Sequence, residues 1–298
     1  MPRIVLVAGL ILLLVVSLIT GWSIGRWQLH PEADTAPEVV AMVELPDWAN
    51  TPLPDFSQYQ VIDERKEAFF DYLFPRIVLA NKAVLDLREH LRGLQAKDEL
   101  TAQDLEWLQS QADRLRVPGE NGSNEQMKAL ALRLDVVAPS LMLAQAANES
   151  SWGTSRFATR GNNLFGQWCW TEGCGHVPER RPDGARHEVA HYDYPYRSIR
   201  SYIANLNRHE AYGELRDVRA GQRQAGDGAD GLQLAEGLES YSERGTAYVR
   251  EIQAMINFNQ LSDYDAEFRR LLASDDLMAE LDARVADYEA RFNGADPD

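Results

Sequence analysis

Residues 139–166 have the sequence PSLMLAQAANESSWGTSRFATRGNNLFG, and the rest of the chain is interpreted around this stretch. Its first part predicts a helix, because Pro139 suits a first helical turn and no β-branched residue follows it before Glu149. Gly153 is expected to end the helix. Glu149 therefore lies in the predicted last turn, where the helix dipole disfavours a negative charge.

A carboxyl group in that position is suited to proton donation. The dipole, partial burial and the nearby ring of Trp152 would all favour the neutral form and raise the pKa of Glu149. A general acid that works near neutral pH needs such a shift. On chemistry alone, a solvated glutamate at a helix end explains the pattern equally well.

The stretch also resembles glycoside hydrolase family 73, whose core motif is roughly LAQAALESGWGTS followed by NNLFG. The matching residues are Ala144, Gln145, Ala146, Glu149, Ser150, Trp152, Gly153, Ser155, Ala158, Asn162, Asn163, Leu164, Phe165 and Gly166. The resemblance covers about residues 124–261, and it is to peptidoglycan endo-β-N-acetylglucosaminidases, in particular the Bax-type proteins of Gram-negative bacteria. It implies an α+β, mainly α-helical, lysozyme-like domain with a small β-lobe. It also implies hydrolysis of the β-1,4 bond after N-acetylglucosamine, with Glu149 as general acid and no cofactor.

The composition is compatible with this function. The chain has 298 residues, of which 45% are hydrophobic, so one or two domains with a sizeable core are expected. A net charge of -16 argues against a nucleic-acid partner, which would require a basic surface. The 7 tryptophans and 11 tyrosines could instead recognise sugars of peptidoglycan glycan strands.

The N-terminal region predicts a membrane anchor. Residues 4–24 are apolar and long enough to span a bilayer, and no small-residue cleavage site follows them, although a cleavable signal peptide is the competing interpretation. We expect a single-pass inner-membrane protein with its body in the periplasm. The expected parts are an anchor (1–29), a Pro-rich linker (30–60), a helical annex (61–122), the glucosaminidase domain (123–261) and an acidic helical tail (262–298).

A second catalytic carboxylate is harder to place. The family carries a glutamate in its β-lobe, in a TxEY-like strand before a turn glycine. Glu179 precedes the predicted turn at Asp183–Gly184, but no tyrosine follows it, and Glu188 lies on the other side of that turn. Either could be an exposed strand residue, and the 2-acetamido group of the substrate could replace a second carboxylate.

The candidate sugar-binding residues are aromatic. They are Trp152, Trp168, Trp170, Tyr241 and Tyr248, of which the two tyrosines resemble a distal tyrosine pair of the family. Core packing is the alternative for Tyr248. Cys169 and Cys174 are expected to form a disulfide in an oxidising periplasm, and a metal site with the adjacent His176 is the alternative.

His187-Glu188-Val189-Ala190-His191 matches the zinc-protease motif H-E-x-x-H. That motif binds zinc from a helix, whereas the alternating pattern here predicts a strand, so no metal site is expected. Three alternatives to glycan hydrolysis stay open: a lytic transglycosylase, a wall-binding scaffold without activity and, more remotely, a zinc protease.

Overall fold

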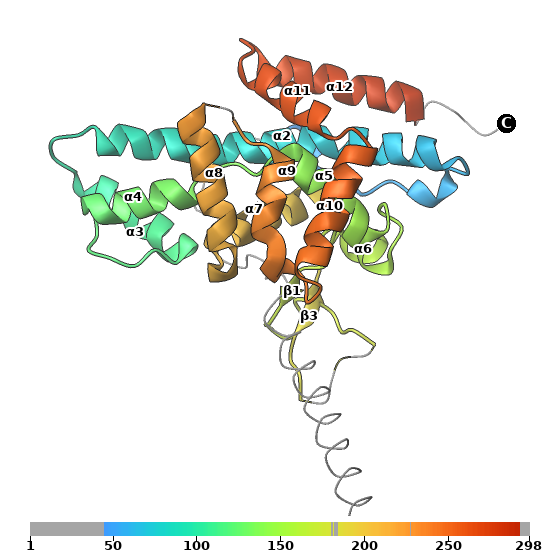
Figure 1. The fold of residues 1–298 in the computed structure, drawn as a ribbon, viewed down its shortest axis with the longest axis horizontal. Helices are drawn as coiled ribbons and strands as arrows, with labels where there is room; N and C mark the ends of the chain where they lie inside the picture. The colour runs from blue at the N-terminus through green and yellow to red at the C-terminus, as the bar shows by residue number, and fades with distance from the viewer. Residues whose placement is uncertain (1–44, 180, 182–183, 227, 293–298) are drawn as a thin grey trace, which may run out of the picture.

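One long helix, α2 (Ile62–Gln95), runs along the molecule and contributes to both of its large hydrophobic cores (Figure 1). The structure is a computed structural model that describes residues 45–179, 181, 184–226 and 228–292. The described chain is mainly helical with one small sheet, which confirms the α+β, mainly α-helical part of the predicted fold class. The predicted anchor lies outside the described residues.

Among the described residues, no helix is both long and apolar enough to cross a membrane.

The second defining helix is α5 (Pro139–Ser150), which carries Glu149. The other helices are α3 (Ala102–Leu115), α4 (Asn124–Arg133), α6 (Arg156–Gly161), α7 (Pro195–Arg208), α8 (Gly213–Ala225), α9 (Gly231–Leu234), α10 (Thr246–Phe258), α11 (Ser262–Leu272) and α12 (Leu277–Phe292). Short 3-10 helices are η1 (Asp47–Asn50), η2 (Phe56–Gln58), η3 (Glu210–Tyr212) and η4 (Ala235–Tyr241).

The larger core surrounds α5. Every residue of this helix from Pro139 to Ala147 is buried, because α2, α9, α10 and α11 pack around it. A helix that is apolar on all sides belongs in the centre of a domain. The smaller core lies between the C-terminal half of α2, α3 and α4, where Leu91, Leu108 and Leu130 are fully buried.

The start of α5 is held by a residue from far along the chain. Ala138 provides no side-chain cap, so the first amides of the helix need another acceptor. The buried carboxylate of Asp265, on α11, accepts hydrogen bonds from the Ser140 amide at 2.8 Å, the Ser140 hydroxyl at 2.6 Å and the Gly231 amide at 3.1 Å. A residue of the predicted tail thus supports the central helix.

The second half of the predicted linker also lies against the body. Ala49 and Phe56 are fully buried, and the buried guanidinium of Arg76 on α2 donates to the Trp48 carbonyl and to the Thr51 hydroxyl. Tyr59 packs edge-on against Phe292 of α12. Residues 45–60 are therefore packed rather than extended, because their aromatic and apolar side chains find partners on α2 and α12. The domain boundaries themselves stay predictions.

The β-lobe follows α6 and projects from the helical body (Figure 1). Its antiparallel strands β1 (Trp168–Cys169), β3 (Glu188–Ala190) and β2 (Gly175–His176) lie in that order. Trp168 pairs with Val189 on one side of β3, and His176 pairs with Val189 on the other.

Gly237→Ala should destabilise the fold. A Cβ on Gly237 would lie 2.3 Å from the backbone nitrogen and Cα of Leu215 on α8, so the two elements would have to separate. We expect the unfolding free energy in urea to fall by about 2–3 kcal/mol. Gly221→Ala, on α8, is the control: apart from the backbone of its own helix, no atom lies within 4 Å of the new Cβ, and the substitution should raise the unfolding free energy by up to about 1 kcal/mol. Equal effects of the two variants would contradict the close approach.

Candidate active site

Glu149 lies one residue before the end of α5, as predicted from its sequence. The chain then turns sharply through three consecutive residues with positive φ, Ser151 at 52°, Trp152 at 59° and Gly153 at 75°. The Trp152 amide donates to the Ala147 carbonyl at 3.0 Å. The Ser150 hydroxyl accepts from the Gly153 amide at 2.8 Å. These bonds satisfy the helix end and hold the backbone beside Glu149 in one conformation.

The two carboxylate oxygens of Glu149 have different surroundings. Oε1 accepts hydrogen bonds from the Tyr248 hydroxyl at 2.8 Å and from the Asn148 side-chain amide at 3.2 Å. No donor in the described part of the chain contacts Oε2. A Cβ at Gly166 would lie 4.0 Å from Oε2, so this glycine brings the backbone close without covering the oxygen. Oε2 is therefore the oxygen that can carry and donate a proton.

The pKa of Glu149 is raised. Burial of this half-buried side chain is the largest cause. The hydrogen bonds from Tyr248 and Asn148 oppose it because they stabilise the charged form. The charge of Glu251 raises the pKa further, and that of Arg244 lowers it. Arg244 and Glu251 also form an ion pair at 2.6 Å, and nothing in the sequence pattern indicated that either belongs near Glu149.

A chain of buried hydrogen bonds sets the direction in which the hydroxyl proton of Tyr248 points. The Tyr202 hydroxyl donates to Gln145 Oε1, and Gln145 Nε2 donates to the Tyr248 hydroxyl at 2.9 Å. Because the Tyr248 oxygen already accepts from an amide, its own proton points to Glu149. Gln145 lies one helical turn before Glu149 on α5 and is fully buried. A polar residue in so apolar a helix was the signal that could have found it.

The two tyrosines predicted to contact sugar lie close to the carboxylate of Glu149. Tyr241 and Tyr248 stack with ring centroids 5.3 Å apart, and both rings are buried. The Tyr241 hydroxyl donates to the Phe165 carbonyl at 3.1 Å. Phe165 in turn stacks on Tyr202 at 4.0 Å. These rings join Tyr248 to the segment that ends at Gly166.

The NNLFG segment connects Glu149 to the β-lobe. Asn162 adopts a left-handed conformation at the end of α6, and its side-chain amide donates to the Tyr192 carbonyl at 2.9 Å. Asn163 is buried and donates to the carbonyls of Gln167 and Ala190, both at 2.9 Å. The lobe therefore holds a defined position relative to the end of α5.

The three candidate tryptophans fall into two groups. Trp152 packs edge-on against Phe69 and Phe70 of α2 and is partly buried. Trp168 and Trp170 lie on the β-lobe with centroids 6.2 Å apart, and Trp168 stacks on His187 at 3.8 Å. Trp170 is 43% exposed, which leaves its ring available to a ligand.

Neither candidate for a second carboxylate is hydrogen-bonded to Glu149. Glu179 is exposed and forms an ion pair with Arg156 of α6. Glu188 is buried on β3, where it accepts hydrogen bonds from the backbone amides of Gly173 at 3.1 Å and Gly175 at 2.8 Å. The Gly173 amide is the largest cause that holds the pKa of Glu188 below its usual range.

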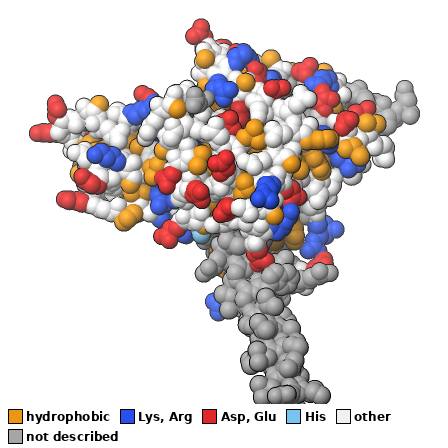
Figure 2. All heavy atoms as spheres, in the orientation of Figure 1, with side chains coloured by type: hydrophobic (Ala, Val, Ile, Leu, Met, Phe, Trp, Pro, Cys, Tyr) orange, Lys and Arg blue, Asp and Glu red, His pale blue; other side chains and the backbone are white. Residues whose placement is uncertain are grey.

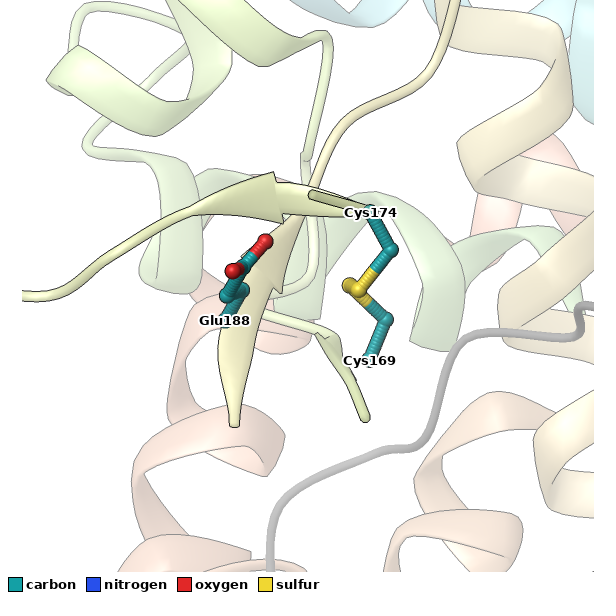
Figure 3. Close-up of side chains that lie close together, drawn as sticks. All are labelled: Cys169, Cys174 and Glu188. Carbon is teal, nitrogen blue, oxygen red and sulfur yellow. A yellow bond between two sulfur atoms is a disulfide. The ribbon is translucent and has the colours of Figure 1, made fainter. Parts of the chain in front are cut away.

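Cys169 and Cys174 are joined by a disulfide across the loop that Glu188 anchors (Figure 3). Within the described residues, the one cluster of three potential metal ligands consists of these two cysteines and Glu188. Both sulfurs are already bonded to each other, so the cluster does not fit a metal ion. The residues of H-E-x-x-H lie on and beside strand β3, not on a helix, and His187 stacks on Trp168 while His191 contacts His176. Zinc-protease geometry is absent from this part of the chain.

Comparison with known proteins agrees with the resemblance found in the sequence. The model of the glucosaminidase family, described as mannosyl-glycoprotein endo-beta-N-acetylglucosaminidase, matches residues 124–261. The chain is 30% identical over 212 residues to Protein bax of Escherichia coli (strain K12), across 71% of this chain and 76% of that protein.

The chain belongs to the Bax-type glucosaminidase family. No solved structure matches it, so the lysozyme-like character of the domain stays a prediction. The matched segment begins with α4 and ends after α10, and it includes Glu149, Tyr248 and the whole β-lobe.

Tyr248→Phe should raise the pKa of Glu149, because the carboxylate loses the hydroxyl that stabilises its charged form. The measurement is a pH titration of the Glu149 side-chain carboxyl by carbon NMR, with the signal assigned from Glu149→Gln. Tyr241→Phe is the matched control, since that hydroxyl donates to Phe165 and not to Glu149. A pKa in Tyr248→Phe equal to that in Tyr241→Phe would contradict the contact.

Proposed function

We propose that this protein hydrolyses the β-1,4 bond that follows N-acetylglucosamine in peptidoglycan glycan strands, with Glu149 as the general acid. The observation that carries the proposal is the state of this carboxyl: half-buried, raised in pKa and bonded through one oxygen alone. A raised pKa favours the protonated form of Glu149, which is the form that a general acid needs when it meets the leaving oxygen. Membership of the glucosaminidase family supports the class of substrate.

Proton transfer would use the two oxygens of Glu149 for different tasks. Oε2 donates its proton to the glycosidic oxygen as the bond to the sugar breaks. Oε1 then carries charge, and the hydroxyl of Tyr248 with the amide of Asn148 stabilises it. Both donors are already in place, so little reorganisation accompanies the reaction.

The sugar itself would supply the nucleophile. Glu188 is engaged by two backbone amides and Glu179 by Arg156, so each has a structural partner in place of a catalytic one. The 2-acetamido oxygen of N-acetylglucosamine can attack the anomeric carbon instead, as in other substrate-assisted glycosidases. Glu149, now ionised, would next take a proton from the water that opens the intermediate.

A lytic transglycosylase is the second candidate, because a single catalytic carboxylate also suffices there. In that reaction a sugar hydroxyl, rather than water, completes the cleavage. Mass spectrometry of the glycan fragments separates the two reactions: hydrolysis adds one water per cleaved bond, and transglycosylation adds none. A scaffold without activity would release no fragment.

We also propose that the body lies in the periplasm, anchored at the inner membrane by residues 1–29. The disulfide between Cys169 and Cys174 supports an oxidising compartment. The apolar run at residues 4–24 supports the anchor.

Glu149→Gln should abolish most glycan cleavage. Glutamine cannot donate a proton to the leaving oxygen, and general acid catalysis contributes about 10²–10⁴-fold. The variant should be at least as stable as the wild type at pH 7, because a carboxyl with a raised pKa costs stability once it ionises. The measurements are fragment release from purified sacculi and the unfolding temperature. A folded variant with wild-type turnover would show that the acid lies elsewhere.

Glu188→Gln should destabilise the β-lobe but have little effect on the rate of glycan cleavage. The Gly173 and Gly175 amides bond to different oxygens of Glu188, and glutamine would place an NH2 donor against one of them. The unfolding temperature should therefore fall by a few degrees, and turnover should change by less than about tenfold. Glu179→Gln is the control and should change stability little, because an exposed ion pair contributes about 0–1 kcal/mol. If either folded variant lost as much turnover as Glu149→Gln, a second catalytic carboxylate would replace substrate assistance.

A further inference from the structure

A cavity of about 250 Å³ is lined mainly by residues of α2, α4 and α8, and α4 contacts the other two helices. Its lining residues are Arg88, Lys128, Ala131, Leu132, Asp135, Ala220, Arg223 and Gln224. Asp135 lies just before α5, whereas Glu149 lies at the far end of that helix. Glu149 lies ten positions beyond Pro139, a rise of about 15 Å along the helix, so this cavity is separate from the candidate active site.

The cavity is positively charged in a strongly acidic chain. Three cations, Arg88, Lys128 and Arg223, line it against the single carboxylate of Asp135. In the whole chain, by contrast, 46 acidic residues outnumber 30 basic ones. Figure 2 shows acidic and basic side chains intermixed over the face in view. The lining of the cavity therefore has an excess of two positive charges, although the chain as a whole has an excess of negative charge.

The one carboxylate is fully used by the arginines. Arg223 binds Asp135 through two nitrogens, with Nε to Oδ2 at 2.6 Å, and Arg88 Nη1 lies 3.4 Å from Oδ2. Burial alone would raise the pKa of Asp135, but the hydrogen bonds of Arg223 and the charge of Arg219 lower it further than burial raises it. Asp135 therefore stays charged and neutralises one of the cations.

Donors remain available around the cavity. Arg88 Nε is buried without a hydrogen-bond partner. No hydrogen bond or ion pair within the described chain engages Lys128, which is exposed on α4, or Nη1 of Arg223. Arg88 Nη1, by contrast, donates to the carbonyls of Ala131 and Leu134 at the end of α4. These hydrogen bonds to the C-terminal carbonyls of α4 explain the position of Arg88 in part. They do not explain why Lys128 and Arg223 line the same cavity.

A further cation lies behind the wall. Arg219 is buried and donates to the carbonyls of Leu132, Asp135 and Val136 at 3.0–3.1 Å. Burial is the largest cause that lowers the pKa of Arg219 to about 10, and the neighbouring arginines contribute to the shift. The cations in this region thus outnumber the carboxylates that pair with them.

We propose that this cavity binds a small oxyanion group, a phosphate or a carboxylate, between Arg88, Lys128 and Arg223. Charge-assisted hydrogen bonds from guanidinium and ammonium groups are the strongest that such an anion can receive. The volume is below the roughly 300–1,000 Å³ of sites for drug-sized ligands, which favours a single anionic group. The bound anion would neutralise the excess charge that the arginines otherwise retain.

Isothermal titration calorimetry of the full chain tests the site with two probes. The first is inorganic phosphate. The second is N-acetyl-alanyl-alanine, compared with its C-terminal amide, which lacks the carboxylate. Saturable binding of phosphate alone would identify a phosphate site, and binding of the peptide acid but not the amide would identify a carboxylate site. No saturable binding of either probe, or equal binding of acid and amide without phosphate binding, would overturn the proposal.

Variants locate the binding. Lys128→Gln should weaken binding about tenfold, because it removes one direct charge without touching the buried arginines. Lys82→Gln is the matched control: it changes the net charge equally, but Lys82 pairs with Asp86 on the surface of α2 and does not line the cavity. Glu149→Gln should bind the anion like the wild type. Equal affinities of Lys128→Gln and Lys82→Gln, or lost binding in Glu149→Gln, would place the anion elsewhere and refute the site independently of the enzymatic activity.

Discussion

Burial of α5 on every side is the constraint on which the site depends. Because α5 is enclosed by α2, α9, α10 and α11, its end cannot fray, and Glu149 points where the packing directs it. The same burial removes water from the carboxyl and so raises its pKa. One packing arrangement therefore both positions the Glu149 side chain and raises its pKa. Asp265 holds the other end of the helix, where burial raises its own pKa to about 6, against the hydrogen bonds of Ser140.

Buried polar residues around Glu149 act as a unit. Tyr202, Gln145 and Tyr248 form a chain in which each donor has one acceptor, and the direction of every proton follows from the amide of Gln145. Such a network is costly if any member is missing, because the remaining partners stay buried without water. Its effect is to engage Oε1 of Glu149, while Oε2 receives no donor from the described part of the chain.

The helix, the position of Glu149 in its last turn and the strand character of the lobe were accessible from sequence because each depends on local signals. Pro139 marks the helix start, and alternating residues around Val189 indicate a strand. The family resemblance named Tyr248 as a candidate, but the hydrogen bonds of Tyr202 and Tyr248 were not accessible, because these residues lie 53 and 99 positions beyond Glu149. Their partners are set by how α7 and α10 pack, which a local pattern does not specify. Similarly, the hydrogen bonds of buried Glu188 come from the amides of Gly173 and Gly175, and its sequence context did not indicate either partner.

The net charge of the chain is also a poor guide to its local electrostatics, because several of its arginines are buried. Arg76, Arg216 and Arg219 are almost completely buried and donate to backbone carbonyls. A guanidinium has five donors, so it can satisfy several backbone carbonyls at once. It keeps its positive charge when it does so. A carboxylate bonded to backbone amides, such as Glu188, keeps its charge in the same way. The field that a ligand meets is therefore set by where these fixed charges lie. That is why a cationic cavity and a carboxyl with a raised pKa can occupy opposite ends of α5 in a chain whose total charge is -16.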